Sequence, residues 1–319
     1  MPHKFNDANR DKFDKARYRV TNASDYNESF RRRGVLMVWV ADDVARDWSS
    51  PRRKTRGGQP LYSDLAIEIC LTLRVVFRLP LRQMQGFMRT IAKLMDLDLV
   101  VPDYSTLSRH GKGLKIVHQR QASDKPITLI VDSTGLQMHG GTDWCTEKHG
   151  SKKPRKTWRK LHIRLDPDTG DIVASELTTE HVGDETAVPG LLAKVDVEVE
   201  RSLADGAYDG QGVYECLVAK YGPDIELIIP PPKNAVLGGN PKRDKHIKDI
   251  ATHGRMKWQT DIGYNQRSLI EAQMRRWKAV IGGSLQARNF DIQVCEISIG
   301  SKVLNRMTGL GRAQYERIL

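Results

Sequence analysis

The run Ile127-Thr-Leu-Ile-Val131, followed directly by Asp132-Ser-Thr-Gly135, decides the fold. It is almost entirely apolar and rich in β-branched residues, which predicts a central strand buried on both faces. A charged residue at the end of a buried strand costs free energy unless a partner satisfies it. The sequence therefore predicts a sheet with Asp132 at a candidate functional position.

The elements that follow this strand predict a mixed sheet. Strands over 161–165 and 172–177 flank the turn Asp166-Pro-Asp-Thr-Gly-Asp171, in which Pro and Gly are the turn-formers. The remaining expectations are a helix over 184–195, a strand over 197–203, a helix over 211–221 capped by Asp209, a strand over 225–229, a polar basic stretch to about 262, and a long helix over 264–281. This β-β-β-α-β-α-β-α order is that of the ribonuclease H fold, an α/β sheet covered by helices.

The chain before this sheet divides into two further segments. Residues 1–60 form a basic N-terminal arm with a short strand at Val35–Val40, although solvated surface explains its basic clusters equally well. Residues 61–122 form a helical domain: one helix is capped by Ser63, a second starts at Pro80, and a short third covers 104–110. Residues 123–319 form the ribonuclease H-like domain.

The helical domain has the outline of a helix-turn-helix DNA reader. In that interpretation Ser105, Thr106, Ser108 and Arg109 face base edges or phosphates. A generic three-helix domain without DNA contact is the alternative.

Composition excludes several classes of protein. The chain has 319 residues, 39% of them hydrophobic and 28% charged, which excludes a mainly disordered chain or a fibre. No apolar run approaches the ~20 residues that a membrane span needs, and the N-terminus lacks a secretory signal, so we expect no membrane partner. The four cysteines are too dispersed for a C-x-x-C motif, as in a cytosolic protein with reduced thiols. The net charge of +12 favours a polyanion as partner.

Four polar residues form one stripe on the predicted long helix. Tyr264, Arg267, Glu271 and Lys278 are separated by three, four and seven residues. At about 100° per residue they fall within an arc of about 60°. A core-facing stripe is apolar, so this one is either a solvated ion-pair face or a functional surface; the rest of the helix holds no other acid.

Two aspartates end neighbouring strands of the predicted sheet. Asp132 follows the first strand and Asp205 follows the fourth. These strands are adjacent in the ribonuclease H order, so we expect the two carboxylates to converge. Taken singly, a pair such as Asp205-Gly206 is usually just a turn.

These motifs together resemble the DDE transposases of bacterial insertion sequences. Tyr264-x-x-Arg267-x-x-x-Glu271-x₆-Lys278 matches the Y-(2)-R-(3)-E-(6)-K signature of that family. Asp132-Ser-Thr-Gly135 and Ala204-Asp205-Gly-Ala-Tyr208-Asp209 are similar to the segments that hold its first and second aspartates. The N-terminal segment Tyr26-Asn27…Arg33-Gly34…Trp39 resembles the insertion-sequence-five group within the family.

The resemblance implies that Asp132, Asp205 and Glu271 are catalytic acids. Three gathered carboxylates raise one another's pKa, and divalent cations remove that conflict. Mg²⁺ prefers carboxylate oxygens, so we expect two Mg²⁺ ions, for which Mn²⁺ can substitute. The implied reaction is attack of water on a phosphodiester at the element's end, followed by attack of the freed 3′-OH on target DNA. Arg267 and Lys278 would bind the flanking phosphates, and Tyr264 a phosphate or a displaced base.

A basic loop joins the first two predicted strands. Between residues 148 and 164 there are eight basic residues, no acid and one tryptophan. We expect this surface to bind the DNA backbone, although a loop that only increases solubility is the alternative. Its members are Lys148, Lys152, Lys153, Arg155, Lys156, Arg159, Lys160 and Arg164, with Trp158 among them.

The expected partners follow from the implied activity. They are double-stranded DNA, as terminal inverted repeats and as target, and a second copy of the chain in a homodimer or larger assembly. The expected location is the bacterial cytoplasm, at the nucleoid. Two other functions remain open: a DNA-binding repressor or domesticated derivative with idle acids, and a structure-specific nuclease on the same fold.

Overall fold

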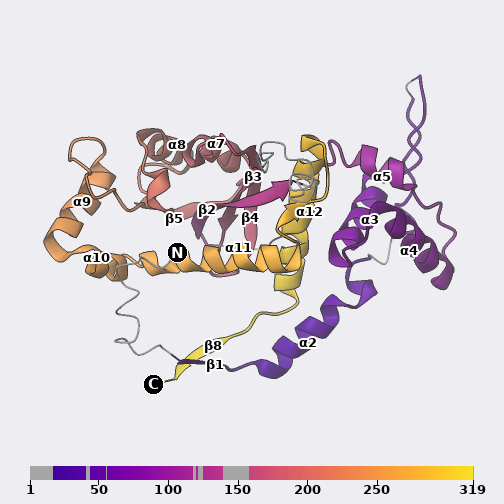
Figure 1. Ribbon diagram of the computed structural model, residues 1–319, viewed down its shortest axis with the longest axis horizontal. Helices are drawn as coiled ribbons and strands as arrows, with labels where there is room; N and C mark the ends of the chain where they lie inside the picture. Colours follow the sequence, from indigo (N-terminus) through magenta and orange to yellow (C-terminus); the bar gives the residue numbers. More distant parts are fainter. Residues whose placement is uncertain are drawn as a thin grey trace, which may run out of the picture.

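A mixed sheet forms the centre of the molecule (Figure 1). The computed structural model describes residues 17–40, 44–54, 56–117, 120, 125–138 and 158–318. The main path of the sheet has the order β4-β3-β2-β5-β6, and the short β7 pairs with β2. The strands are β2 (Ile127–Met138), β3 (Trp158–Leu165), β4 (Ile172–Thr179), β5 (Val199–Leu203), β6 (Glu226–Ile228) and β7 (Ser284–Leu285).

The pairing confirms the ribonuclease H-like prediction. β2, β3 and β4 are antiparallel neighbours, whereas β2–β5 and β5–β6 are parallel. The β3–β4 turn closes with the Gly170 N–H donating to the Asp166 carbonyl at 2.8 Å. Gly170 has φ +73°, a conformation that glycine adopts readily.

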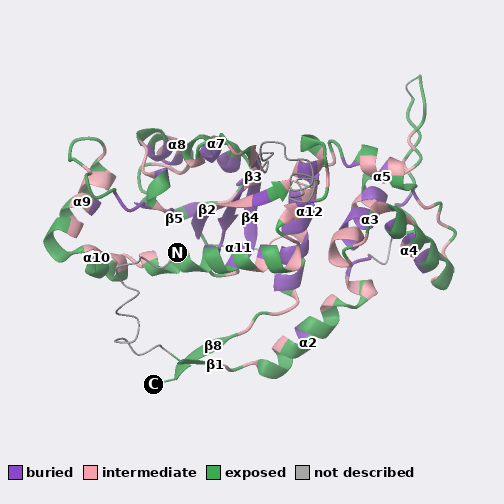
Figure 2. Cartoon of the chain, viewed as in Figure 1, coloured by how far each residue is buried: buried purple, intermediate pink, exposed green. Residues whose placement is uncertain are grey.

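Helices cover both faces of this sheet (Figures 1 and 2). α7 (Asp184–Ala193) and α8 (Gln211–Tyr221) lie on one side, and α11 (Ser268–Val280) lies on the other, against β2. α12 (Phe290–Gly309) packs against β4. Leu129 and Val131 belong to the cluster under α7 and α8, whereas Ile130 belongs to the cluster on the α11 side. This alternation explains why the run in β2 is continuously apolar.

The segment before the sheet is mostly helical. It contains α2 (Ala23–Arg33), the 3₁₀ turn η2 (Leu36–Val38), α3 (Asp64–Val76), α4 (Leu81–Leu94) and α5 (Tyr104–His110). The Ser63 hydroxyl accepts from the Ala66 N–H at 3.1 Å, which is the cap that the sequence predicts for α3.

The prediction of a strand at Val35–Val40 is wrong. This run contains η2 instead, and Trp39 and Val40 are buried with the neighbouring helices. Val35 and Met37 are exposed, so only part of this apolar run is buried, and it is buried without any partner strand. The N-terminal strand is β1 (Arg17–Val20), which pairs antiparallel with β8 (Tyr315–Ile318) near the end of the chain.

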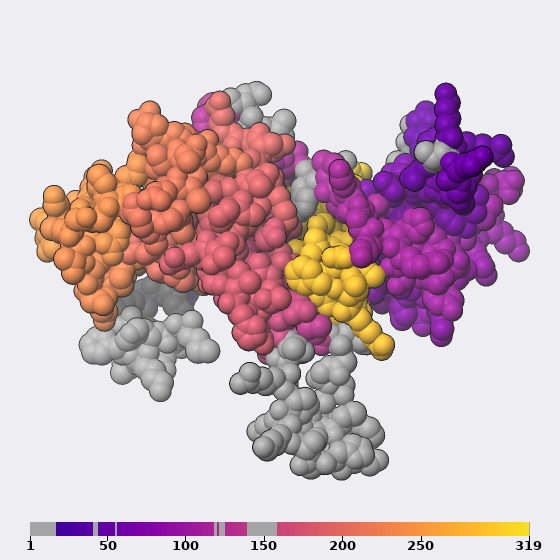
Figure 3. Space-filling model, turned by 90° about the horizontal axis from the view of Figure 1, so that it is seen from above, coloured from indigo at the N-terminus to yellow at the C-terminus, as the bar shows by residue number. Residues whose placement is uncertain are grey.

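The N-terminal helices pack directly onto the C-terminal helix. Figure 3 shows the yellow C-terminal segment between the magenta and indigo N-terminal part and the rest of the molecule. α3 packs against α12, and Glu68 forms an ion pair with Lys302 across that contact. One hydrophobic cluster includes Leu73 of α3 and Val303 of α12. The two segments therefore share a core.

The polar, basic stretch before residue 262 contains helices that the sequence did not predict. It holds α9 (Pro241–His253) and α10 (Arg255–Asp261), and η4 (Tyr264–Arg267) precedes α11. Gly210, not Asp209, occupies the N-cap position of α8. The Asp209 carboxylate instead accepts from Arg243 at 2.9 Å and from the Tyr214 hydroxyl at 3.1 Å. Within the described ranges, no helix is both long and apolar enough to cross a bilayer.

Candidate active site

Three acidic residues reach one region from three elements. Asp132 lies within β2, Asp205 follows β5 as the N-cap of η3 (Gly206–Tyr208), and Glu271 lies in the first turn of α11. Ile130 pairs with Leu203, so each aspartate lies two residues beyond a paired position and both come from the same level of the sheet. α11 packs against β2, which brings Glu271 toward Asp132.

A single guanidinium links two of these acids. Arg267 Nη1 lies 3.0 Å from Asp132 Oδ2, and Arg267 Nη2 lies 2.5 Å from Glu271 Oε1. Only 17% of the Asp132 side chain is exposed, against 60% for Glu271. The acid on the sheet is therefore desolvated, whereas the acid on the helix faces solvent.

The charges of the other two acids act on Asp132. Burial raises the pKa of Asp132, and the like charges of Asp205 and Glu271 raise it further, against the Ser133 N–H and Arg267, which lower it. The Asp205 carboxylate itself accepts from the Ala207 N–H at 2.9 Å. Asp205 and Glu271 therefore both lie near enough for their charges to act on Asp132.

The tyrosine of the predicted stripe borders the acids. Burial raises the pKa of Tyr264 to about 12, and the charges of Arg267, Asp205 and Asp132 also act on it. Its ring lies 5.6 Å from the Trp258 ring. The phenol is consequently neutral at physiological pH and can donate a hydrogen bond. Lys278 lies exposed in the last turn of α11, two turns beyond Glu271 on the same face.

The chemistry of the acids suits a divalent cation. Carboxylate oxygens are the preferred ligands of Mg²⁺ and Mn²⁺. Among the residues that the structure describes, no three His, Cys, Asp or Glu side chains are already arranged as a ligand set. Arg267 lies between Asp132 and Glu271. A cation would therefore compete with this guanidinium for the same oxygens.

A second polar group, not predicted from the sequence, lies beside Asp132 on the α7 side. The Asp184 carboxylate accepts from the Ser133 hydroxyl at 3.0 Å and from Lys160 Nζ at 3.3 Å. The fully buried His162 places Nδ1 3.8 Å from the same oxygen. In the sequence, Asp184 is recognisable only as an acid at the start of a helix. Its partners lie on β2 and β3, so no local pattern indicates this group.

The basic loop is described only from Trp158 onward. Lys148, Lys152, Lys153, Arg155 and Lys156 lie outside the described residues. Trp158 packs over Gly135 of the neighbouring strand.

Residues Arg159 and Lys160 alternate in direction along β3. Arg159 Nε donates to Gln293 of α12 at 3.2 Å, and Lys160 binds Asp184 on the opposite face. Arg164 is fully buried, so its inclusion in a DNA-facing surface is wrong. An arginine whose side chain is fully buried cannot reach a phosphate outside.

The candidate DNA-contact residues of the short helix α5 differ in their exposure to solvent. Thr106 is buried, and its hydroxyl donates to the Asp103 carboxylate at 2.9 Å, so this side chain stabilises the start of the helix. Ser105 and Ser108 are half-buried, and Arg109 is exposed. Arg109 Nε donates to the Ser105 carbonyl at 3.3 Å.

Comparison with protein families agrees with this geometry. A family model described as "Transposase DDE domain" matches residues 123–306, more than half of the chain. A second model with the same description matches residues 31–141. The chain belongs to the DDE transposase family. DDE transposases are nucleases and strand transferases that use divalent metal ions.

Two solved structures align with this transposase at low similarity. One is a pre-cleavage Mos1 transpososome, 9% identical, covering 82% of this chain and 83% of that one, with a TM-score of 0.21. The other is the Mos1 transposase paired-end complex with the left transposon end, 10% identical, covering 82% of both chains, with a TM-score of 0.23. The family assignment rests on the two domain models.

Proposed function

We propose that this transposase binds the terminal inverted repeats of its insertion sequence, cleaves phosphodiester bonds at the ends and joins the 3′-OH ends to target DNA. The observation that carries the proposal is the convergence of Asp132, Asp205 and Glu271 around Arg267. Three carboxylates from three elements are costly to gather, so their convergence in a DDE family member supports a catalytic role.

The three acids would hold two divalent ions, Mg²⁺ or Mn²⁺. Bound there, such ions activate the attacking oxygen and stabilise the leaving one. Arg267 and Lys278 would bind the phosphates on either side of the scissile bond, the first through its fork and the second as a point charge. Tyr264 would donate its neutral hydroxyl to a phosphate or stack on a displaced base.

Other parts of the chain would hold the DNA. We assign residues 61–122 to recognition of the repeats through Ser105 and Arg109, and residues 123–319 to catalysis. The segment 152–160 would bind the DNA backbone. Because two element ends must be held together, the active form would be a homodimer or a larger assembly on DNA at the nucleoid. The segment Tyr26–Trp39 favours the insertion-sequence-five group.

The test is a nicking assay on DNA that carries the inverted repeats flanking the gene. Asp132→Asn, Asp205→Asn and Glu271→Gln should each abolish nicking in Mg²⁺, while binding of the same DNA in EDTA persists. Glu215→Gln is the matched control, because Glu215 is an exposed acid on α8, which covers the face of the sheet opposite to α11. Full nicking by any of the three variants would overturn that residue's assignment.

The same assay separates the two other functions. Binding without nicking in either metal would identify a repressor or a domesticated derivative. Nicking with no preference for the repeat ends would identify a structure-specific nuclease.

A further inference from the structure

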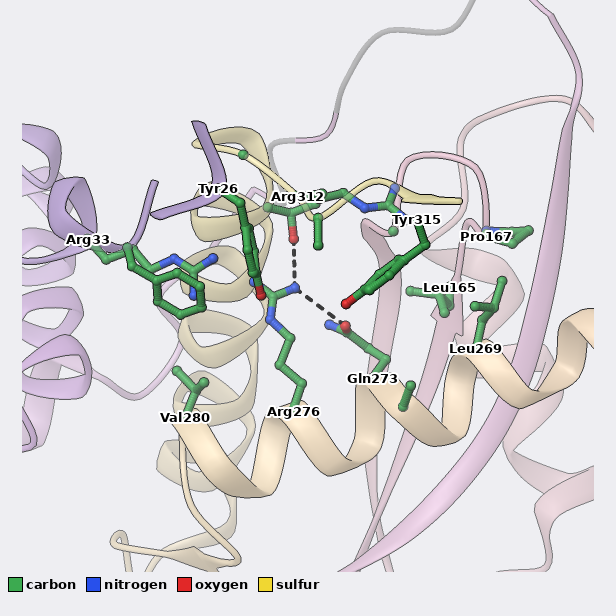
Figure 4. Close-up of a pocket in the computed structure, with 16 residues that line it drawn as sticks. Tyr26, Arg33, Leu165, Pro167, Leu269, Gln273, Arg276, Val280, Arg312 and Tyr315 are labelled. Carbon is green, nitrogen blue, oxygen red and sulfur yellow. Dashed lines mark hydrogen bonds between the residues drawn. The ribbon is translucent and has the colours of Figure 1, made fainter. Parts of the chain in front are cut away.

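A cavity of about 450 Å³ lies on the far side of α11 from the acids. Its walls come from α2, α11, the β3–β4 turn and the chain that follows α12 (Figure 4). Gln273 and Arg276 line it, and they lie about 200° and 140° around α11 from Glu271. The cavity is thus separate from the candidate active site.

Three arginines gather at this cavity without a carboxylate partner. Arg33, Arg276 and Arg312 all line it. Arg276 donates to the Thr308 hydroxyl at 2.8 Å and to the Leu304 carbonyl at 3.1 Å, and Arg312 donates to the Asp168 carbonyl at 2.7 Å. Arg33 Nε is buried with no hydrogen-bond partner. Within the described part of the chain, no carboxylate lies within ion-pair distance of any of them.

The charges act on one another across the cavity. The pKa of Arg276 is lowered to about 10: burial lowers it most, Arg33 and Arg312 also lower it, and Tyr26 and Asp171 raise it. Burial also lowers the pKa of Arg33, so the Arg276 and Arg33 guanidinium groups carry their charges at a cost in free energy. An anion between them would remove that cost, since buried charges are stable when paired.

Aromatic rings flank the same charges. Figure 4 shows the Tyr26 and Tyr315 rings on either side of the Arg276 head group. The centroid of the Phe30 ring lies 4.8 Å from that of the Tyr26 ring. Arg33 Cζ lies over the Phe30 ring, 4.0 Å from its centroid. A bare inorganic anion would use only the arginines. A ligand that joins an anionic group to a flat ring would use both halves of this lining.

We propose that this cavity binds a nucleotide, with its phosphate at Arg33, Arg276 and Arg312 and its base against Tyr26 and Tyr315. Guanidinium forks bind phosphate in bidentate geometry, and every base has a face that stacks on tyrosine. The nucleotide is either free or the terminal residue of a DNA strand, which present the same chemistry. The proposal does not depend on the catalytic assignment, because the cavity shares no side chain with the acidic site.

The test is calorimetric titration of the full chain in EDTA, where no cleavage occurs. The probes are deoxyadenosine monophosphate, deoxyadenosine and inorganic phosphate. We expect the nucleotide to bind more tightly than either part. Arg33→Gln and Arg312→Gln should each weaken its binding about tenfold or more, the effect of removing one hydrogen bond to a charged group. Arg317→Gln is the matched control, because Arg317 lies exposed on the adjacent β8 outside the cavity.

A further variant separates the base from the phosphate. Tyr26→Leu should weaken the nucleotide several-fold and leave inorganic phosphate unchanged. Nucleotide binding no tighter than phosphate binding, or unaffected by both arginine variants while their unfolding curves match the wild type, would overturn the proposal. Competition by a 5′-phosphorylated single strand, lost in Arg312→Gln, would support the site with a DNA strand as its ligand. Nucleotide binding without such competition would support it with a free nucleotide.

Discussion

Arg267 is the residue on which the acidic site depends in this arrangement. Its two ion pairs hold Asp132 and Glu271, which would otherwise repel each other. Its side chain is only 21% exposed, so solvent does little to weaken the contact with the largely buried Asp132. The same guanidinium binds carboxylate oxygens that a divalent cation would need as ligands. Arg267 therefore stabilises the apo site and competes with its metal.

Arg267→Gln should accordingly have opposite effects on stability and on metal affinity. In EDTA we expect a loss of about 1–3 kcal/mol in the free energy of unfolding, because two carboxylates lose their charged partner. Affinity for Mn²⁺ should rise, because no guanidinium has to be displaced. Thermal unfolding in EDTA and calorimetric Mn²⁺ titration measure the two quantities.

Lys278→Gln provides the control for this prediction. Lys278 lies on the same face of α11 but is exposed, so its loss should change neither quantity appreciably. Equal unfolding temperatures for Arg267→Gln and wild type in EDTA would contradict the structural role given to Arg267.

Single residues differ in how far the sequence predicts them. The Arg267–Glu271 contact follows from a four-residue spacing, and the structure forms it although Arg267 lies in a 3₁₀ turn. The Arg267–Asp132 contact joins residues 135 positions apart, so no spacing in the sequence predicts it. Arg164 shows the limit, since a run of basic residues does not reveal which of them turns inward.

At the level of elements, α11 is positioned by its close crossing with α12. A Cβ atom at Gly300 of α12 would lie 2.7 Å from Trp277 Cη2 of α11. Trp277 is buried and cannot move aside freely. Gly300→Ala should therefore lower the free energy of unfolding by about 1–3 kcal/mol and reduce nicking, because α11 carries Glu271.

Gly309→Ala is the matched comparison within the same helix. No heavy atom lies within 4 Å of the Cβ that it would add. This change should leave stability equal or slightly higher, since alanine favours helix. Urea unfolding of the two variants side by side measures the difference, and equal midpoints would mean that the crossing tolerates a methyl group.

Strand β3 carries a histidine that makes stability depend on pH. Burial lowers the pKa of the fully buried His162, Lys160 lowers it further, and Asp184 and Glu176 raise it. Below about pH 6.5 the unfolded chain therefore gains a proton that the folded chain does not, and stability falls as the pH decreases. Above that pH the effect vanishes.

His162→Gln should remove this acid-side slope. We expect the difference in slope between wild type and variant to approach about 1.4 kcal/mol per pH unit below pH 6.5. Urea unfolding at pH 7.5, 6.5 and 5.5 in EDTA measures it. His181→Gln, at an exposed position 81% open to solvent, should keep the wild-type slope. A slope unchanged in His162→Gln would place the acid sensitivity elsewhere.

Elements with strong local signals are the ones that the sequence predicts. The cap at Ser63 and the apolar run of β2 are signals that each extend over only a few residues. Both α3 and β2 form as expected. α9 was missed although Asn240 caps it and Pro241 occupies its first turn, because few apolar residues mark its buried face. Val35–Val40 was misassigned because an apolar run predicts burial but not strand geometry.

The arrangement of the whole molecule lies beyond such local signals. The proposed nucleotide cavity is lined by residues of α2, α11 and the chain after α12, so no spacing in the sequence predicts it. The shared core of α3 and α12 likewise joins residues more than 200 positions apart. This packing makes the N-terminal helices part of one structural unit with the sheet.

A single unfolding transition is therefore expected in differential scanning calorimetry. Leu73→Ala in α3 removes a fully buried side chain from the cluster that also contains Val303 and Trp277. It should cost about 2–5 kcal/mol and shift the entire transition, because α12 loses packing when α3 does. Leu217→Ala in α8, within the cluster on the other face of the sheet, should shift the same transition by a similar amount. Two resolved transitions, of which Leu73→Ala moves only one, would show instead that the N-terminal helices unfold separately from the catalytic sheet.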